Sequence, residues 1–346
     1  MARVAAQLTN FTAGELSPRL DGRNDLAKYS AGCATVENMV IYPHGAAARR
    51  PGTQYVAEVK TSANSTRIIP FEFNTEQTYI LELGNLYMRF YRDNGQILEG
   101  NKTITAITKA NPGVITCSSH DYLTGDEINI SSIVGMTELN NKRFLVVKID
   151  ANTFSLTDVD GVAINTTNFT TYGSAGTMNR VFQITTTYTT AEIFDLKFAQ
   201  SADVMYITHP NHQTRKLSRT GHTTWTLAAV EFTNGPFLDT NVSTTTLTPA
   251  SAGVGTGVNV TASAVTGING GSGFLTTDVG RQIRIGDGYG IITARTNTTV
   301  VVVTVTTAFA NTNANTDWSL GAFSTTTGFP SCVSFFEQRL VFAASI

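Results

Sequence analysis

Apolar and polar side chains alternate most regularly between Ile68 and Leu98, in the segment IIPFEFNTEQTYILELGNLYMRFYRDNGQIL. A period of two is the spacing of residues that share one face of a β-strand. The positions that follow this period are Phe71, Phe73, Tyr79, Leu81, Leu83, Tyr87, Arg89 and Tyr91. Turn-forming residues separate them at Asn74 to Gln77, at Gly84-Asn85 and at Asp93-Asn94-Gly95. The segment therefore predicts three short antiparallel strands.

The same succession of strands and turns returns twice. Residues Asp195 to Leu227 repeat it, and a third, partial copy runs from Val333 to Ser345. One such meander is too small to bury its own faces, so repeats of it indicate blades of a β-propeller or a similar array. A propeller needs at least about four blades. We therefore expect either a longer protein or a subunit that a partner completes.

Two other β units separate the copies. Residues Ile107 to Met178 contain short strands with Gly and Asn turns, which is typical of a compact barrel or sandwich. Residues Val258 to Leu320 form the second unit. It includes Val300 to Val305, a nearly continuous apolar run that predicts a strand covered on both faces rather than an exposed edge.

These patterns predict an all-β fold, in which a partial β-propeller-like platform of short meanders is interrupted by two inserted small β-barrel or sandwich domains. Only 14% of the residues are charged, and this composition favours strands over surface helices. The predicted divisions are an N-terminal arm (1–56), a first platform segment (57–106), an inserted β-barrel domain (107–180), a second platform segment (181–243), a second inserted β domain (244–322) and an incomplete third platform segment (323–346).

The N-terminal arm is rich in turns, and Asn24 is placed to cap a short helix from Asp25 to Ala31. The arm also holds the main concentration of basic residues. They are Arg19, Arg23, Lys28, Arg49 and Arg50. One interpretation is a solvated surface or a contact with another subunit or an adaptor protein. The other is a guide for a polyanion such as DNA, since arginine suits phosphate contacts.

Charge and cysteine content narrow the function classes. The net charge of −2 gives no global attraction to nucleic acid or to an anionic membrane. Three widely spaced cysteines, Cys33, Cys117 and Cys332, do not indicate a disulfide framework or a metal knuckle. No window approaches the roughly 20 apolar residues of a membrane span, and the N-terminus lacks the apolar run of a signal peptide.

Candidate chemistry is sparse. His209-Pro210-Asn211-His212, with His222 further on, is the best metal-like cluster, but Pro210 at a turn fixes no relation between the two rings. Asp158-Val159-Asp160-Gly161 is similar to the start of a calcium loop but lacks the later glutamate. We predict ordinary turns at both places, and we predict no catalytic residue, no cofactor and no bound metal. The chain is not expected to be an enzyme.

Several segments together resemble a known family. They are NFTAGELSPRLDGRNDLAKYSAGCATVENMVIYPHGAAARRPGT, FEFN with QTYILELGNLYMRFYRDNG, FDLKFAQSADVMYITHPNHQTRKLSRTGHTTWTL and TTGFPSCVSFFEQRLVFA. They resemble the N-terminal portion of the nozzle, or tail tubular, proteins of short-tailed bacteriophages. The first inserted unit is similar to a small β-barrel module of many phage tail proteins, which is sometimes likened to a half-domain of ubiquitin-activating enzymes. We do not expect it to bring their catalysis, because Cys117 lies in a strand-like segment without an activating group.

The resemblance implies a structural virion protein in the phage tail, made in the host cytoplasm. It would form the distal tail tube or nozzle ring, act as a conduit for DNA ejection and attach adaptor and fibres. Its implied partners are itself, as a homohexameric ring, the tail adaptor and portal proteins, tail fibres or spikes, and double-stranded DNA in passage. Two alternatives remain open: a carbohydrate-binding or adhesin-like tail protein, and a polysaccharide-cleaving enzyme with a pair of carboxylates.

Overall fold

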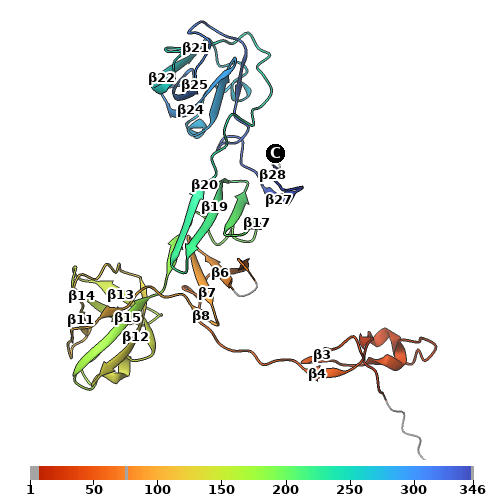
Figure 1. The fold of residues 1–346 in the computed structure, drawn as a ribbon, viewed down its shortest axis with the longest axis vertical. Helices are drawn as coiled ribbons and strands as arrows, with labels where there is room; N and C mark the ends of the chain where they lie inside the picture. Colours follow the sequence, from red (N-terminus) through yellow and green to blue (C-terminus); the bar gives the residue numbers. More distant parts are fainter. Residues whose placement is uncertain (1–7, 75–76, 344–346) are drawn as a thin grey trace, which may run out of the picture. The chain divides into compact units, whose positions relative to one another are not determined.

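The computed structural model describes residues 8–74 and 77–343, and its regular elements are β-strands with a few short 3-10 turns. The prediction of an all-β fold is confirmed (Figure 1). The chain divides into two compact units, Met1–Val56 and Ala57–Ile346. In the stretch of the chain that the structure describes, no helix is long and apolar enough to cross a membrane.

The first unit has little regular structure. Its elements are β1 (Gly14–Glu15), η1 (Pro18–Leu20), η2 (Tyr29–Ala31), β2 (Gly32–Cys33), β3 (Met39–Ile41) and β4 (Ala47–Arg49); β1 pairs in parallel with β2, and β3 pairs antiparallel with β4. The helix predicted from Asp25 is wrong, because these residues form turns that end in η2. Leu26 stays 36% exposed, so no buried apolar face stabilises a longer helix.

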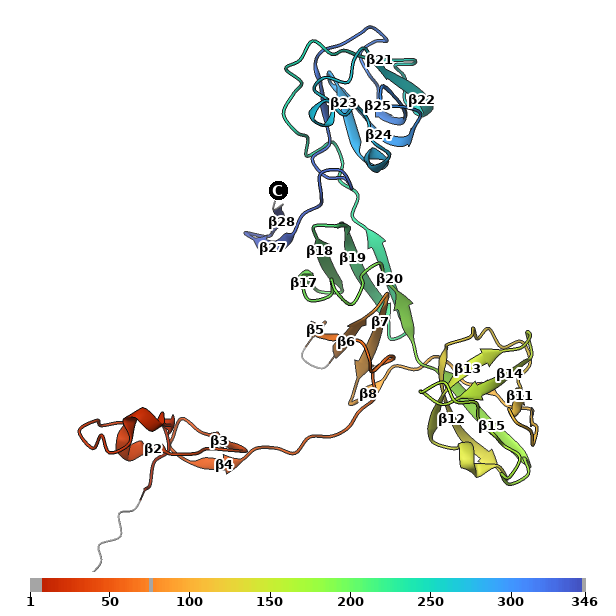
Figure 2. The same ribbon diagram turned by 180° about the vertical axis from the view of Figure 1, so that it is seen from behind.

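The centre of the second unit is a pair of antiparallel meanders, one in a five-stranded and one in a four-stranded sheet. The first contains β5 (Arg67–Glu72), β6 (Thr78–Gly84), β7 (Tyr87–Arg92) and β16 (Gln183–Thr185), with β8 (Gly95–Gln96) on β7. The second contains β17 (Lys197–Ser201), β18 (Val204–His209), β19 (His212–Gly221) and β20 (Thr224–Ala229). Figure 2 shows both meanders from behind.

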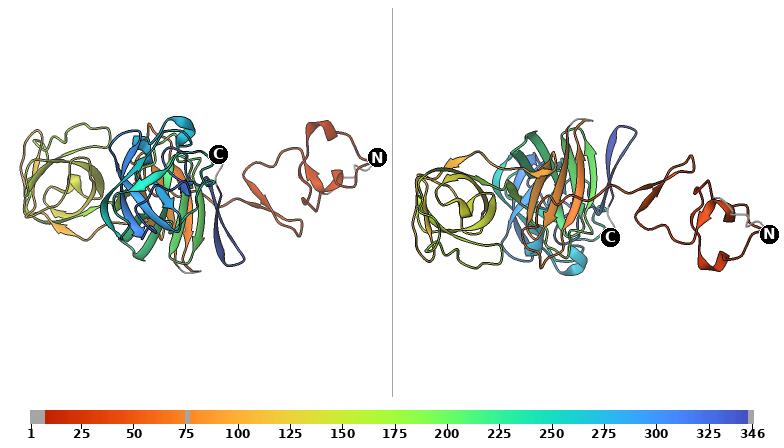
Figure 3. Two further views of the ribbon diagram at one scale, coloured as in Figure 1. Left: turned by 90° about the horizontal axis from the view of Figure 1, so that it is seen from above. Right: turned by 90° about the horizontal axis from the view of Figure 1, so that it is seen from below.

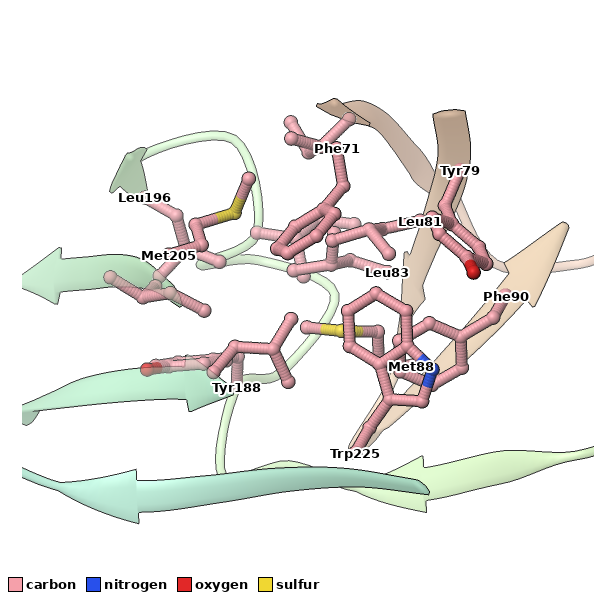
Figure 4. Close-up of a cluster of buried hydrophobic side chains, with 14 of the residues drawn as sticks. Phe71, Tyr79, Leu81, Leu83, Met88, Phe90, Tyr188, Leu196, Met205 and Trp225 are labelled. Atoms are coloured by element: carbon pink, nitrogen blue, oxygen red, sulfur yellow. The ribbon is translucent and has the colours of Figure 1, made fainter. Parts of the chain in front are cut away.

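The two meanders bury their apolar faces in one shared core (Figure 4). Trp225 of β20 stacks on Phe90 of β7 with 4.3 Å between ring centroids. Phe71 and Tyr79 contact the same indole edge-on, at 4.9 and 5.3 Å. Such aromatic contacts each add about 0.5–1.5 kcal/mol beyond the area they bury. Neither meander is closed without the other, as expected for a repeat too small to bury its own face.

Strand β7 separates a core face from a polar face. Met88 and Phe90 lie in the shared core, whereas Tyr87, Arg89 and Tyr91 share the opposite face, in keeping with the period of two. Tyr87 Oη donates to Glu82 Oε1 at 2.6 Å, and Tyr91 Oη donates to the other oxygen of the same carboxylate. Arg89 of this polar face contacts the next domain along the chain.

A seven-stranded antiparallel sheet follows and curls around its own core (Figure 3, yellow to green). Its strands, in sheet order, are β10 (Ala106–Ile107), β11 (Val114–Thr116), β14 (Thr153–Thr157), β13 (Lys142–Lys148), β12 (Glu127–Val134), β15 (Ser174–Arg180) and β9 (Lys102–Thr103), with η3 (Thr137–Leu139) between β12 and β13. We call residues 102–180 the first barrel.

A six-stranded sheet forms a second curled domain with a separate core. Its elements are β21 (Leu247–Pro249), β22 (Gly255–Ala262), η4 (Asn269–Gly271), η5 (Thr276–Asp278), β23 (Gln282–Ile285), β24 (Gly288–Arg295), β25 (Val300–Thr307) and β26 (Trp318–Leu320). β25 lies between β22 and β24, so it is an interior strand. Its burial alternates, however: Val301, Val303 and Val305 are buried and the other face is half-buried. The prediction that this run is not an exposed edge is therefore confirmed, whereas the prediction that both of its faces are covered is wrong.

Each curled domain is closed at its base by one short bridge. Leu98 pairs with Val181 where the chain leaves and rejoins the first meander, and Phe237 pairs with Gly321 at the other domain. Backbone hydrogen bonds flank the first bridge, since Phe182 N donates to Ile97 O at 2.9 Å. The two ends of each domain therefore lie side by side.

The last described element is a hairpin of β27 (Cys332–Phe336) and β28 (Arg339–Ala343). It packs beside the second meander, where Tyr206 contacts the rings of Phe335 and Phe342 with centroids 6.2 Å apart. The end of the predicted third copy, at Ser345, lies outside the described residues.

Candidate functional sites: the first barrel and a histidine cluster

The interior of the first barrel is a packing core rather than a reactive site. Cys117 is 2% exposed and lies among the buried side chains of the core. Burial raises the pKa of its thiol, so the nucleophilic thiolate is disfavoured. The structure thus gives Cys117 a packing role.

An ion-paired group anchors the first barrel to the first meander. Glu127 of β12 forms ion pairs with two arginines. Arg89 Nη2 lies 2.8 Å from one carboxylate oxygen, and Arg143 Nη1 lies 2.8 Å from the other. The side chains of Arg89 and Glu127 are 0% and 4% exposed. At the same base, Arg180 forms ion pairs with Glu99 at 2.7 Å and with Asp126 at 2.9 Å. The Arg89–Glu127 pair is buried, and a buried charge needs a partner, so this pair links β7 of the meander with β12 of the barrel.

The outer surface of the first barrel carries exposed apolar side chains. Leu123, Val147 and Ile149 are 60%, 36% and 56% exposed. The turn that holds Leu123 lies against β13, because Lys148 N donates to Thr124 Oγ1 at 3.1 Å. We call Leu123, Val147 and Ile149 the β13 patch. Exposed apolar groups that cluster in this way often mark a contact surface for another protein.

A second candidate site lies at the hairpin between β18 and β19. His209 ends β18, His212 begins β19, and the two residues face each other across the turn with ring centroids 5.1 Å apart. Glu192 comes from a turn upstream, and its Oε1 lies 2.9 Å from His212 Nε2. The sequence did not indicate this residue, because it lies far from the histidines along the chain and follows no local motif. The three residues form what we call the histidine cluster.

Contacts around the histidine cluster fix its side chains. Thr189 donates its N–H and its hydroxyl to Glu192 Oε2 at 2.9 and 2.8 Å. Burial raises the pKa of Glu192, but these hydrogen bonds and the contact with His212 outweigh it and lower the pKa to about 2. Burial also lowers the pKa of His209, which favours the neutral imidazole. The cluster thus presents an ionised carboxylate beside a neutral, buried histidine.

A cavity of about 310 Å³ adjoins the histidine cluster. His212 and Arg215 of β19 line it, together with Phe232, Gln282 and Phe323. His222 lies elsewhere, since its ring contacts Tyr79 Oη at 2.8 Å and Arg92. Within residues 8–74 and 77–343, Glu192, His209 and His212 are the group of three side chains placed to share a metal ion.

The other residues singled out in the sequence do not converge on a site of this kind. Asp158 accepts hydrogen bonds from Asp160 N and Val162 N, which is the geometry of a plain turn. The five basic residues all lie in the first unit. Arg23 forms a bidentate contact with Asp25, and Arg50 donates to Asn38 Oδ1 at 2.8 Å. Their predicted role in subunit, adaptor or DNA contacts stays a prediction.

Comparison with known proteins finds relatives of the first barrel. Residues 110–181 match the family model of the ubiquitin-activating enzyme E1 FCCH domain. Ubiquitin-like modifier-activating enzyme 1 of Oryctolagus cuniculus is 35% identical over 82 residues, and that of Homo sapiens is 34% identical over 82 residues. The match covers 22% of this chain and 7% of each relative. The chain therefore spans only a small fraction of the length of the relatives it matches.

These matches contradict the identification of the chain as a phage nozzle protein. The predicted virion location, the conduit for DNA ejection, and the glycan-binding and glycan-cleaving alternatives are corrected with it. The prediction that the chain is not an enzyme is also contradicted, since the matching relatives are activating enzymes, although one domain alone carries the match. The resemblance rested mainly on segments of the arm and meanders, whereas the barrel has its own core and can be compared as a separate domain. The first barrel is a domain similar to the FCCH domain of ubiquitin-activating enzymes.

Proposed function

We propose that this chain takes part in the handling of a ubiquitin-like modifier, and that the first barrel is the domain that contacts the modifier. The observation that carries the proposal is the continuous match of residues 110–181 to the FCCH domain. The first barrel has a complete hydrophobic core, so it can present a fixed surface to a partner.

The β13 patch is the surface we assign to this contact. Its three apolar side chains are exposed on adjacent segments, and burying one aliphatic side chain contributes about 1.5–3 kcal/mol. The one cysteine of the barrel points the same way, because Cys117 is buried and burial raises the pKa of its thiol. The proposed role of the domain is therefore binding and positioning.

Isothermal titration calorimetry of the full chain with ubiquitin as the probe tests this function. We expect saturable binding, and we expect Ile149→Asp to weaken it at least tenfold, about 1.4 kcal/mol, because a charge replaces an apolar contact. Val134→Asp is the matched control, because Val134 is 57% exposed on β12 of the same barrel but lies outside the patch. No binding at about 1 mM ubiquitin, a concentration that detects even weak complexes, would overturn the proposal. Equal losses in the two variants would overturn the assignment of the patch.

A further inference from the structure

The histidine cluster combines three donor groups that suit one cation. The candidate ligand atoms of Glu192, His209 and His212 all lie within 4.8 Å of one another. Two imidazoles and one carboxylate are a ligand set that divalent zinc adopts in proteins, with a fourth position left to water or another ligand. The sequence predicted an ordinary turn at His209 and His212 because it did not reveal the third residue.

The backbone holds the three groups in place from two separate segments. His209 and His212 are a cross-strand pair at the end of the β18–β19 hairpin, which sets the spacing of their rings. Glu192 is held through its Oε2 by Thr189, so that its Oε1 remains directed at His212. A site whose side chains are already oriented loses less conformational entropy when a ligand binds.

Two of the proposed ligands already have partners that a cation would replace. Asn211 N donates to His209 Nδ1 at 3.1 Å. If His209 binds the metal through Nε2, its ring proton lies on Nδ1, which then cannot accept the hydrogen bond from Asn211 N. Metal binding therefore replaces the Asn211 contact with a bond to the cation. Binding at His212 Nε2 likewise replaces its contact with Glu192.

The cavity beside the histidine cluster leaves space for a fourth ligand of the metal ion. His212 lines both the cluster and the cavity, which has room for several water molecules. Arg215 also lines the cavity and would favour an anion in it. We infer that Glu192, His209 and His212 form a binding site for a divalent transition-metal ion such as Zn²⁺, with its open position toward this cavity. The site is independent of the modifier-binding function proposed for the first barrel.

Zinc titration of the full chain, stripped of metal with a chelator, tests this inference. We expect one Zn²⁺ per chain with a dissociation constant below about 10 µM, and a Co²⁺ complex with the visible absorption of a four-coordinate ion. His212→Gln and Glu192→Gln should each weaken Zn²⁺ binding at least tenfold. His222→Gln is the matched control, since it removes a histidine outside the cluster, and it should leave the affinity unchanged.

Two results would overturn the site. One is a folded wild-type chain that binds no Zn²⁺ at one equivalent. The other is binding that His212→Gln and Glu192→Gln do not weaken, which would place the ion elsewhere. Circular dichroism of each variant verifies its fold, and the wild-type titration remains decisive if a variant does not fold.

Discussion

At the scale of single residues, the attachment of the first barrel depends on a few buried charges. Glu127 holds Arg89 and Arg143 in a setting from which water is largely excluded. The alternation of Tyr87, Arg89 and Tyr91 showed that these residues share a face, but it did not show that this face meets another domain. The same limit applies to the histidine cluster. The sequence indicated His209 and His212, but Glu192 comes close to them only when a separate turn of the chain folds against the hairpin.

Replacing Glu127 with alanine should strongly destabilise the region where the barrel meets the first meander. The change leaves Arg89 buried without its counter-charge, and removing one partner of a buried pair costs about 3–5 kcal/mol. Urea unfolding followed by circular dichroism measures the loss. Asp121→Ala is the control, because Asp121 is 60% exposed in its ion pairs with Lys102 and Arg180, and exposed pairs contribute about 0–1 kcal/mol. Equal effects of the two changes would contradict this account of the buried pair.

At the scale of elements, the two central meanders form one folding unit because they share a core. The period of two in the sequence correctly indicated Phe71, Tyr79, Leu81 and Leu83 as one set, and the structure places all four in that core. The sequence could not tell which face of β7 joins it, since both faces of this strand carry large side chains. That choice depends on Trp225, which arrives from a strand far along the chain.

Trp225→Ala should therefore weaken both meanders together. Truncating a buried tryptophan costs about 3–5 kcal/mol, from lost burial and the cavity that remains. Hydrogen–deuterium exchange should show faster exchange in β5 to β7 and in β17 to β20, while β12 and β13 keep their protection because the first barrel has a separate core. Trp318→Ala is the matched control, since Trp318 belongs to the core of the second curled domain. Loss of protection confined to β17–β20 would argue against a shared core.

At the scale of the whole molecule, three separate hydrophobic cores explain why the sequence predicted the fold class better than the function. The period of two and the turn residues are local features of the sequence, and they are enough to predict that the chain is all-β. The family resemblance rested mainly on segments of the arm and meanders, whereas the domain that matches a family model is the first barrel. The first unit has no such core: Gly45 is the one buried residue among its described positions. The predicted contact of this unit with another subunit, an adaptor or DNA stays a prediction.

Self-association through the basic residues of the first unit is a prediction at this scale. Reversing both charges, Arg49→Glu with Arg50→Glu, should shift the chain toward the monomer at least tenfold if these residues face another copy. Sedimentation velocity over a range of concentrations measures the shift. Lys142→Glu with Lys197→Glu is a charge-matched control on exposed strand residues of the second unit. A wild-type chain that stays monomeric, or equal shifts in both variants, would contradict the prediction.

The bridge between Leu98 and Val181 also determines how the molecule would respond to mechanical load. Because the two ends of the first barrel meet at this bridge, tension applied along the backbone passes from one side of the bridge to the other and bypasses the barrel. The bridge between Phe237 and Gly321 shields the second curled domain in the same way. Under stretching, the chain would first extend between Val56 and the meanders. The first barrel and the second curled domain would each stay folded until its own bridge had broken.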